Sequence, residues 1–523
     1  MNYRLLSRTL GIICLLLAVS MLFSLPWAIP SLGWRGHLPE PKETPQFEFR
    51  GFTSLVASSV ISALVGITLI WAGRGSRGQT LFRKEAMATV GLTWILATIL
   101  GAMPYLLSGT QAAKGQRISI VDALFEAQSG FSTTGATVLT QLEDPAMVPH
   151  CILFWRSSTH FLGGLGIVVL LVAILGQGAG GKAMMRAEVT GPTKDNQFSR
   201  MQQMAVVFAS IYILLNLVLA VIFWISGMSL FDALCHAFAT LATGGFSTYN
   251  ASLGHFDSPW IEYVAILFMI LAGTNFVLLL FAARGHWKNL WQDTEWKVYI
   301  SILSIVSVAV IIFGQINNDF LNLGTAIRDS VFQVVSIMTT TGFATADYDV
   351  WNNFGRGVLI LLMFVGGCAG STGGGMKVIR HVLLAKILRL ELELSYHPKV
   401  VRPLRINGQN VDGNDLRKTI LVYFGLVAAI FACSWLVLIT IEPDRQWVSG
   451  ATTELDHKLL DCASAIAATL HNIGPGYGVV GPTANYQGFS DASKLLFVFL
   501  MMLGRLEMFS ILVLFVPAFW RKI

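Results

Sequence analysis

The chain has 523 residues, of which 54% are hydrophobic and only 13% are charged. Soluble proteins carry about 25% charged residues, so this composition excludes a soluble globular protein and indicates a polytopic membrane protein. The formal net charge of +6 is no sign of nucleic-acid binding, because the cytoplasmic loops of membrane proteins are basic as a rule. The six cysteines show no C-x-x-C spacing, and we interpret them as small hydrophobic residues.

Two apolar segments come first. Residues 1–30 contain a long apolar run from Leu10, which is longer than the core of a cleaved signal peptide and predicts a retained helix. A polar, proline-containing stretch at 31–50 predicts an external loop, and a second span follows at about 52–73. The next loop, 74–84, is basic and is therefore expected on the cytoplasmic side.

The rest of the chain repeats one short pattern four times. Each copy begins with an aspartate and ends with a glycine at the same distance along the chain. The pairs are Asp122 and Gly135, Asp232 and Gly245, Asp329 and Gly342, and Asp461 and Gly474. The apolar segment between them is about ten residues long, whereas a spanning helix needs ~20. Aspartate is a common N-cap and glycine permits left-handed backbone, so each copy predicts a half-helix that starts at the aspartate and ends in an irregular stretch.

Each copy lies between two long apolar segments, which predicts the plan span, half-helix, glycine turn, span. The fold class we expect is an all-α polytopic membrane protein, with two N-terminal helices and four helix–pore loop–helix repeats in a pseudo-four-fold arrangement around one pore. This gives ten spans, with both termini on the basic, cytoplasmic side. The expected units are residues 1–76 (two N-terminal helices), 77–190 (repeat one), 191–290 (repeat two), 291–400 (repeat three, with an intramembrane gating loop) and 401–523 (repeat four).

The four irregular stretches predict a cation site. Irregular backbone at membrane depth survives only where it is buried in protein or lines a wet cavity. Four such stretches around one axis would form a ring of carbonyl oxygens and threonine hydroxyls, which suits a dehydrated monovalent cation. The negative C-terminal ends of the half-helices favour the same charge. The residues expected to form this filter are Thr133, Thr134, Gly135, Ala136, Thr243, Gly244, Gly245, Phe246, Thr340, Thr341, Gly342, Phe343, Asn472, Ile473, Gly474 and Pro475.

A glycine-rich stretch interrupts the second span of repeat three. Residues 366–377 read GGCAGSTGGGMK, and each interior glycine costs a helix about 1 kcal/mol relative to alanine. We therefore expect an unwound loop on the cytoplasmic side of the filter, where it would obstruct the pore; close helix packing through small residues is the alternative. The expected gate residues in this stretch are Gly370, Ser371, Thr372, Gly373, Gly374, Gly375 and Lys377.

Two arginines lie inside apolar spans. Arg505 falls near the middle of the last predicted span, about 492–519, and a mid-membrane arginine usually faces a polar cavity or a partner. We expect it to donate hydrogen bonds to carbonyls of the gating loop and to raise an electrostatic barrier to cations. Arg156 lies nearer an outer end of its span, and we interpret it as an interfacial anchor.

These segments resemble a known family. FEAQSGFSTTGATVL, ATLATGGFSTYN, TTTGFATADYD and ATLHNIGPGYG are similar to the four pore loops of the Trk/Ktr/HKT superfamily of potassium transporters, GGCAGSTGGGMK to its intramembrane gating loop, and LGRLE to the segment that carries its arginine. The two extra N-terminal spans resemble the bacterial TrkH branch. The resemblance implies filter glycines at Gly135, Gly245, Gly342 and Gly474. It also implies a homodimer in the bacterial inner membrane, K+ as the transported ion, and a cytoplasmic TrkA-like nucleotide-binding regulatory subunit as partner.

The fourth loop departs from the family pattern, because Asn472-Ile473-Gly474-Pro475 stands where the others have threonine and an aromatic or small residue. The ring is therefore not four-fold in its chemistry. With one shared glycine in each loop, fewer sites are fully defined by carbonyls than in a potassium channel. We expect potassium to be favoured over sodium and rubidium to be tolerated.

Other classes of protein fit less well. A secondary transporter with discontinuous helices predicts inverted repeats and an intramembrane carboxylate, whereas the four repeats share one orientation. Proton- or sodium-coupled potassium symport remains open, because sequence does not separate a gated pore from coupled uptake. A membrane enzyme would need a nucleophile and base or a metal cluster, and none is evident. We therefore expect no enzyme activity, no catalytic residue, no organic cofactor and no nucleic-acid partner.

Overall fold

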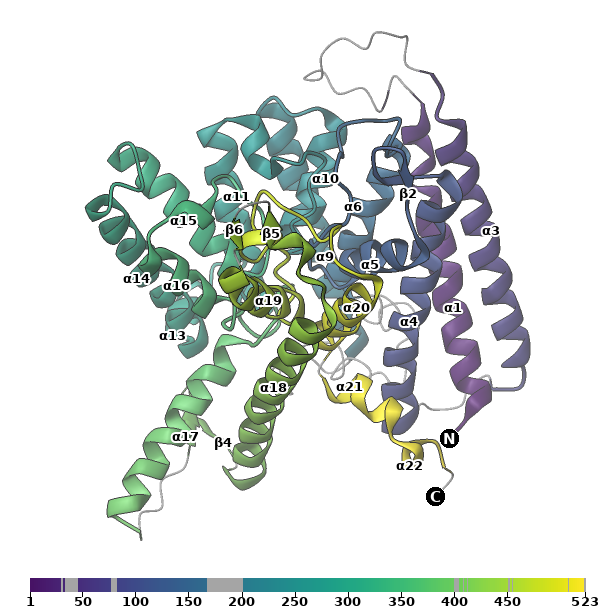
Figure 1. Ribbon diagram of the computed structural model, residues 1–523. Coiled ribbons are helices and arrows are strands. Elements are labelled where there is room, and N and C mark those ends of the chain that lie inside the picture. The colour runs from purple at the N-terminus through teal and green to yellow at the C-terminus, as the bar shows by residue number, and fades with distance from the viewer. Residues whose placement is uncertain are drawn as a thin grey trace.

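The computed structural model describes residues 1–29, 32, 46–76, 82–166, 201–398, 404–407, 409–411, 413–449, 452–453, 455–506 and 508–521. The regular elements of these parts are helices, apart from three short antiparallel hairpins. The N-terminal pair consists of α1 (Tyr3–Leu22), continued by the 3-10 turn η1 (Leu25–Ala28), and α3 (Phe49–Ala72). Figure 1 shows this pair at one edge of the molecule, packed against α4 (Arg83–Ser108).

The four repeats follow in chain order. Repeat one has α4, the half-helix α5 (Ile120–Phe131) and α6 (His150–Leu165). Repeat two has α9 (Met201–Ile225), the half-helix α10 (Leu230–Leu241), α11 (Pro259–Ala272) and α12 (Phe276–Ala283). Repeat three has α13 (Trp287–Gln292), α14 (Thr294–Ile316), the half-helix α15 (Leu323–Met338), α16 (Asn353–Leu362) and α17 (Val378–Tyr396). Repeat four has α18 (Gly413–Ile441), the half-helix α19 (Leu455–Leu470), α20 (Asp491–Arg505), α21 (Phe509–Leu512) and α22 (Pro517–Trp520).

The strands form small hairpins in the connections between helices. They are β1 (Gln111–Ala113) with β2 (Gln116–Arg117), β3 (Leu404–Ile406) with β4 (Gln409–Val411), and β5 (Val448–Ser449) with β6 (Thr452–Thr453). Short 3-10 turns η2 to η6 lie at Ser252–Phe256, Tyr348–Val350, Asp444–Gln446, Gly478–Val480 and Val513–Phe515. The domain boundaries expected at 76/77, 190/191 and 400/401 fall on or beside residues outside the described parts, and the boundary expected at 290/291 falls within α13. All four stay predictions.

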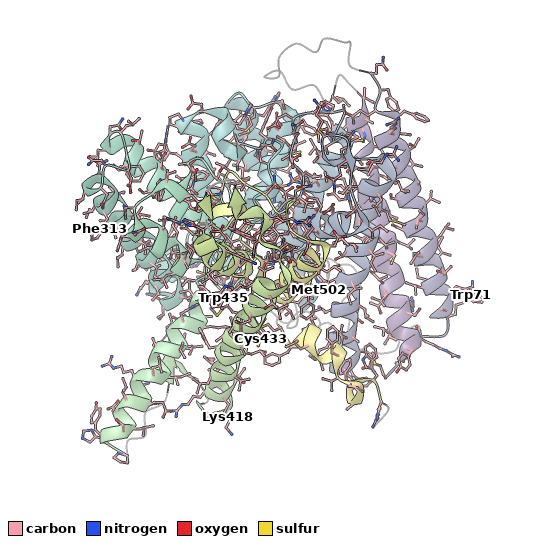
Figure 2. All side chains as sticks on the ribbon, in the orientation of Figure 1. Trp71, Phe313, Lys418, Cys433, Trp435 and Met502 are labelled. Carbon is pink, nitrogen blue, oxygen red and sulfur yellow. The ribbon has the colours of Figure 1, made fainter. Side chains whose placement is uncertain are left out.

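The apolar helices suit a bilayer. Six helices in the described parts are long and apolar enough to span a membrane, and two bent helix pairs bring the number to as many as eight. Large hydrophobic side chains are exposed on their outer faces, and Figure 2 shows two of them, Trp71 and Phe313, at opposite edges of the molecule. An apolar exterior of this extent is stable in lipid and not in water, so the protein is a multi-pass membrane protein.

Inner helices connect neighbouring half-helices around the centre of the molecule. The inner helix α6 contacts α5 of its own repeat and α10 of the next, and α11 likewise contacts α10 and α15. In repeat four α20 contacts α19 and returns to α5 of repeat one. The expected pseudo-four-fold arrangement of helix–loop–helix repeats is therefore present.

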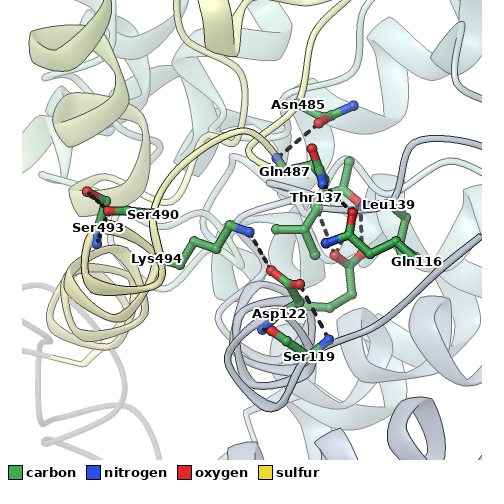
Figure 3. A network of polar contacts seen from close by, with 12 residues as sticks. Gln116, Ser119, Asp122, Thr137, Leu139, Asn485, Gln487, Ser490, Ser493 and Lys494 are labelled. Atoms are coloured by element: carbon green, nitrogen blue, oxygen red, sulfur yellow. Dashed lines mark hydrogen bonds and ion pairs between the residues drawn. The ribbon is translucent and has the colours of Figure 1, made fainter. Parts of the chain in front are cut away.

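One buried ion pair marks the place where repeat four meets repeat one. Lys494 of α20 lies 2.6 Å from the carboxylate of Asp122 on α5, and both side chains are buried. Figure 3 shows Lys494 pointing toward Asp122, whose other carboxylate oxygen faces the Ser119 backbone at the start of α5. Because a lone buried charge is costly, this pair fixes how the two elements meet.

The aspartates of the repeats are not N-caps, as the sequence pattern had suggested. Ser119 and Ser229 cap α5 and α10, and Asp122 and Asp232 are the third residue of their helices. Asn322 caps α15, so Asp329 lies in its second turn. The expectation failed because serine and asparagine are equally good N-caps and stand a few residues earlier.

The inner helices are also more broken than expected. The segment at 258–283 was predicted as one span, but α11 and α12 meet at an angle of 107° across residues 273–275. The segment at 492–519 divides likewise, because α20 and the helical segment from Phe509 to Phe515 form an angle of 118°. Arg505 is therefore the last residue of α20, at a break and not within a continuous helix. In repeat one, α6 ends at Leu165, and the rest of its predicted span at 150–176 lies outside the described residues.

We predict that close packing of α1 on α3 depends on the absence of a side chain at Gly66. A Cβ there would lie 2.8 Å from the Gly11 carbonyl oxygen, so Gly66→Ala should lower stability by about 1–3 kcal/mol through overpacking. Thermal unfolding of the purified protein in detergent measures the effect. Gly425→Ala on α18 is the control, because nothing lies within 4 Å of its Cβ and its melting temperature should stay equal or rise. Equal melting temperatures for both variants would contradict the prediction.

Candidate ion-binding site

The four half-helices end in the same way. Two residues after the last residue of each half-helix, the backbone lies in the left-handed region. The residues are Thr133, Thr243 and Asn472, with φ between 54° and 56°, and Thr340, with φ of 60°. In repeat one the Thr133 N–H donates to Gly130 O and the Thr134 N–H donates to Ser129 O, the two bonds of a Schellman motif. The corresponding pairs of bonds occur after α10, α15 and α19. Four separate sequences therefore adopt one backbone trace.

Threonine is an unusual choice for this position. A β-branched residue in the left-handed region is a genuine outlier, and such strain costs of order 1–3 kcal/mol and collects at functional sites. The hydroxyls of these threonines have different surroundings. Thr340 Oγ1 accepts a hydrogen bond from the Gly374 N–H at 2.8 Å, whereas Thr133 Oγ1 has no hydrogen-bond partner among the described residues. Thr243 Oγ1 donates to Ala242 O, so among the three threonines Thr133 is the one whose hydroxyl is available to a polar ligand in the described parts.

The filter glycines follow two residues later and close a ring. Gly135, Gly245, Gly342 and Gly474 have φ between 74° and 98°, which only glycine adopts readily. A Cβ on each would collide with a carbonyl oxygen of the next loop. The contacts run from Gly135 to Gly244 O, from Gly245 to Thr341 O, from Gly342 to Ile473 O, and from Gly474 back to Thr134 O.

This closed sequence of contacts places the four glycines around one axis. In each case the carbonyl that is approached belongs to the residue just before a filter glycine. The glycines of the first three loops are partly exposed, whereas Gly474 is buried. The structure therefore brings together residues that the sequence places more than 300 positions apart.

Each half-helix also carries a polar side chain that holds the chain as it leaves the filter. Glu126 accepts a hydrogen bond from the Val138 N–H at 3.1 Å, and Ser464 accepts one from the Tyr477 N–H at 2.9 Å. With its amide oxygen turned toward the loop, Gln333 accepts from the Thr345 N–H at 3.0 Å. The fourth of these residues, His236, contacts Ser247 Oγ at 2.9 Å. These side chains stand nine or ten residues before the filter glycine, and sequence analysis did not single them out.

The fourth loop differs in its contacts as well as in its sequence. Asn472 donates to Thr134 Oγ1 at 3.0 Å and to Met501 O at 2.9 Å, so its amide bridges repeats four and one. The hydroxyl of Tyr486 donates to Gly474 O at 2.7 Å, and this carbonyl is therefore already engaged by protein. The expected departure from four-fold chemistry is thus visible in the hydrogen bonds.

The glycine-rich stretch of repeat three is unwound, as predicted. Between the end of α16 and the start of α17, the Gly366 N–H donates to Met376 O at 2.7 Å and closes a compact loop. The loop contacts the elements that carry the filter, since Thr372 Oγ1 donates to Leu241 O at 2.8 Å. Together with the bond from Gly374 to Thr340, this contact places the loop directly beside the ends of two half-helices.

Two cationic side chains bind the carbonyls of this loop. Lys377, fully buried, donates from Nζ to Gly373 O and lies 3.3 Å from Ser371 Oγ. Arg505 donates from Nη1 to Thr372 O at 2.7 Å and from Nη2 to Gly163 O on α6. The expected donation from Arg505 to a loop carbonyl is therefore present. Its guanidinium joins the inner helices of repeats one and four to the loop of repeat three.

A carboxylate holds the two ends of the same loop. Glu295, at the start of α14, accepts hydrogen bonds from the Ala369 N–H at 2.7 Å and from the Ile379 N–H at 3.0 Å through one oxygen. Its neighbour Asp293 accepts from Asn407 Nδ2 at 2.8 Å, at the turn of the β3–β4 hairpin. Sequence analysis missed Glu295, because nothing local connects it to a loop about 75 residues away.

Arg156 is not an interfacial anchor. Its side chain is 2% exposed and pairs with the buried Glu126, with 2.6 Å between Nε and Oε1. It also donates to Ser247 O at 2.8 Å, and its guanidinium lies 3.4 Å from the centre of the Phe246 ring. The interpretation as an anchor failed because the position of a residue within an apolar segment does not show whether another helix offers it a polar partner.

An acidic group lies near the fourth loop. Asp349, in the connection between Gly342 and α16, accepts a hydrogen bond from the Gly478 N–H at 3.1 Å. Burial, and secondly the neighbouring charge of Asp347, raises the pKa of this carboxyl to about 6. Asp349 therefore places an acidic side chain beside the fourth loop.

Four re-entrant hairpins that meet in a ring of backbone carbonyls, inside an apolar helical body, define a membrane protein that handles ions. The model of the TrkH family, described as a cation transport protein, matches residues 54–522. This chain therefore belongs to the TrkH family.

Individual relatives agree. The Trk system potassium uptake protein TrkH of Escherichia coli K12 is 36% identical over 465 residues, which cover 88% of this chain and 91% of that protein. The protein of the same name from Salmonella typhimurium is 35% identical over 528 residues and is covered completely. The crystal structure of the potassium transporter TrkH from Vibrio parahaemolyticus superimposes with a TM-score of 0.81 at 32% identity, over 100% of both chains.

We predict that Glu295→Ala loosens the gating loop. The change leaves the Ala369 and Ile379 N–H groups without their acceptor, and an unsatisfied buried donor costs about 1–3 kcal/mol. Hydrogen–deuterium exchange of peptides that cover residues 366–379 should therefore accelerate. Glu391→Ala, at an exposed position of α17, is the control and should leave these rates unchanged. Unchanged exchange in the Glu295 variant would show that its carboxylate does not hold the loop.

Proposed function

We propose that this protein takes up potassium ions across the bacterial inner membrane through a gated, channel-like pore. The observation that carries the proposal is the closed ring of glycine contacts, which turns four irregular backbone stretches toward one axis at membrane depth. Fixed carbonyl dipoles there replace the hydration shell of an ion. The relatives named as potassium uptake proteins supply the identity of the ion.

The proposal assigns each predicted site residue to the filter or to the gate. The filter consists of the left-handed position, the residue after it, the glycine and the following residue of each loop. The gate consists of the loop from Gly370 to Gly375 with Lys377 and Arg505, whose positive charges lie beside the ring and oppose the passage of a cation. Ion conduction needs no bond to be made or broken, so the proposal assigns no catalytic residue.

We also propose that the chain works as a homodimer with a cytoplasmic nucleotide-binding subunit of the TrkA type. Figure 1 shows both termini at the end of the molecule toward which α17 and α18 project, and we assign this end to the cytoplasm. Basic side chains gather on the projection. They include Arg389 and Lys418, and Figure 2 shows Lys418 near the outer end of α18. Positive charge on this side agrees with the rule for cytoplasmic loops and offers a docking surface.

Rubidium uptake into liposomes tests the function. Purified protein should carry radioactive rubidium down its own gradient, without a proton or sodium gradient, and potassium should compete better than sodium. Gly245→Ala should reduce this flux by about tenfold or more, because its Cβ would collide with the Thr341 carbonyl oxygen in the ring.

The matched control is Gly109→Ala. Gly109 has a φ of 71°, so alanine is similarly strained there, but nothing lies within 4 Å of its Cβ. Its flux should equal that of the unmodified protein. Uptake that occurs only with an imposed proton or sodium gradient would favour coupled symport, and no uptake of rubidium under either condition would overturn the proposal.

We predict that removal of the gate raises the flux. Deletion of Gly370–Gly375 takes away the carbonyls that Lys377 and Arg505 bind, and Arg505→Met is a gentler variant that removes one positive charge and the hydrogen bonds to Thr372 O and Gly163 O. Both variants should carry rubidium faster than the unmodified protein in the liposome assay. Arg389→Met, at an exposed position of α17, is the control. An unchanged or lower flux in folded protein would argue against a gating role.

A further inference from the structure

We propose that Arg156, together with Glu126, determines ion selectivity by fixing the separation of filter loops one and two. Arg156 is a positioning residue in this inference, because it contacts the backbone that leaves the filter and not the ion. The inference rests on the proposed function and goes beyond it, since it names a side chain outside the four loops on which discrimination between ions depends.

The first observation is the set of contacts that the guanidinium makes. Arg156 Nε pairs with Glu126 at 2.6 Å, and Nη1 donates to Ser247 O at 2.8 Å. The ring of Phe246, the residue after filter glycine Gly245, lies against the guanidinium with 3.4 Å between the Arg156 Cζ and the ring centre. One planar cation therefore holds both the backbone and a side chain of loop two.

The second observation is the set of hydrogen bonds that Glu126 accepts. Its carboxylate accepts hydrogen bonds from Thr137 Oγ1 at 3.0 Å and from the Val138 N–H at 3.1 Å. Thr137 stands two residues after Gly135, and Ser247 stands two residues after Gly245. The ion pair thus connects matching positions of neighbouring loops, just beyond the two glycines.

Burial explains why this connection is stiff. Arg156 is 2% exposed and Glu126 is fully buried, so water does not compete for either charge. Charge-assisted hydrogen bonds are short and directional, and the rigid fork of a guanidinium fixes two acceptors relative to each other. A sodium ion is smaller than a potassium ion, so a carbonyl ring discriminates between them only if its oxygens keep their spacing.

The pair belongs to one quadrant of the ring. At the same number of residues after the filter glycine as Arg156 in repeat one, the other repeats have Ile266, Met363 and Leu495. Loops three and four carry different supports, such as the bond from Ser464 to the Tyr477 N–H. If the ion pair of Arg156 and Glu126 is lost, no similar ion pair at the matching position of another repeat replaces it in holding loops one and two.

The test compares rubidium and sodium fluxes in liposomes. Arg156→Gln should keep rubidium flux measurable while the ratio of rubidium to sodium flux falls about tenfold, the change that corresponds to the loss of one charge-assisted hydrogen bond. Arg156→Lys retains the charge without the fork and should restore the ratio in part. Glu126→Gln retains an acceptor for the Val138 N–H and should reduce the ratio less.

A second buried ion pair, between repeats one and four, supplies the matched control. The double variant Asp122→Asn with Lys494→Gln removes a pair of similar burial that makes no hydrogen bond to the filter backbone within the described parts of the chain. It should lower the melting temperature and leave the flux ratio unchanged. A merely structural role for Arg156 would give this same result in the Arg156 variants.

The outcomes separate the two proposals. If the unmodified protein carries rubidium selectively and Arg156→Gln is equally selective, the inference is overturned and the proposed function stands. If the unmodified protein carries no rubidium, the proposed function fails and the inference fails with it. If Arg156→Gln does not yield folded protein, Glu126→Gln decides, and an unchanged ratio there overturns the inference.

Discussion

The structure depends on one constraint. Backbone that turns carbonyl oxygens toward an axis inside a membrane must still give every other polar group of that backbone a hydrogen-bond partner. A carbonyl that faces an ion is unavailable to a helix or sheet. The chain solves this with a half-helix that ends in two backbone bonds, a left-handed residue and, two residues later, a left-handed glycine. The same solution appears four times, and the glycine contacts close the copies into a ring.

Behind this common backbone the supporting chemistry varies. The N–H that leaves the filter needs an acceptor, and carboxylate, amide and hydroxyl oxygens all serve, as Glu126, Gln333 and Ser464 show. A symmetric backbone therefore does not require a symmetric sequence. The variation has consequences, because a carboxylate at this position recruits the arginine that an amide or a hydroxyl does not.

Sequence alone predicts the four repeats, the ring and the unwound loop, because these features depend on local rules. A glycine that ends a half-helix and a stretch with six glycines in twelve residues can be recognised without knowing which other residues they contact. The breaks in the inner helices were missed, since a single Gly273 before α12 looks like an ordinary helical glycine. Arg156 and Glu295 were misjudged or missed for a different reason. Their roles are defined by acceptors and donors that lie 30 to 91 residues away along the chain, at distances that a pattern search does not cover.

The same kind of atom has opposite consequences on the two sides of the filter. In the ring, the backbone carbonyls that approach the filter glycines belong to strained loops. In the gating loop, the carbonyls of Thr372 and Gly373 are occupied by Arg505 and Lys377. In the proposed gate, these protein cations occupy carbonyls that a passing ion would need, and positive charge there repels that ion. Opening under this proposal requires the donors to leave their carbonyls, whereas Glu295, which binds N–H groups at the two ends of the loop, can keep its contacts while the middle moves.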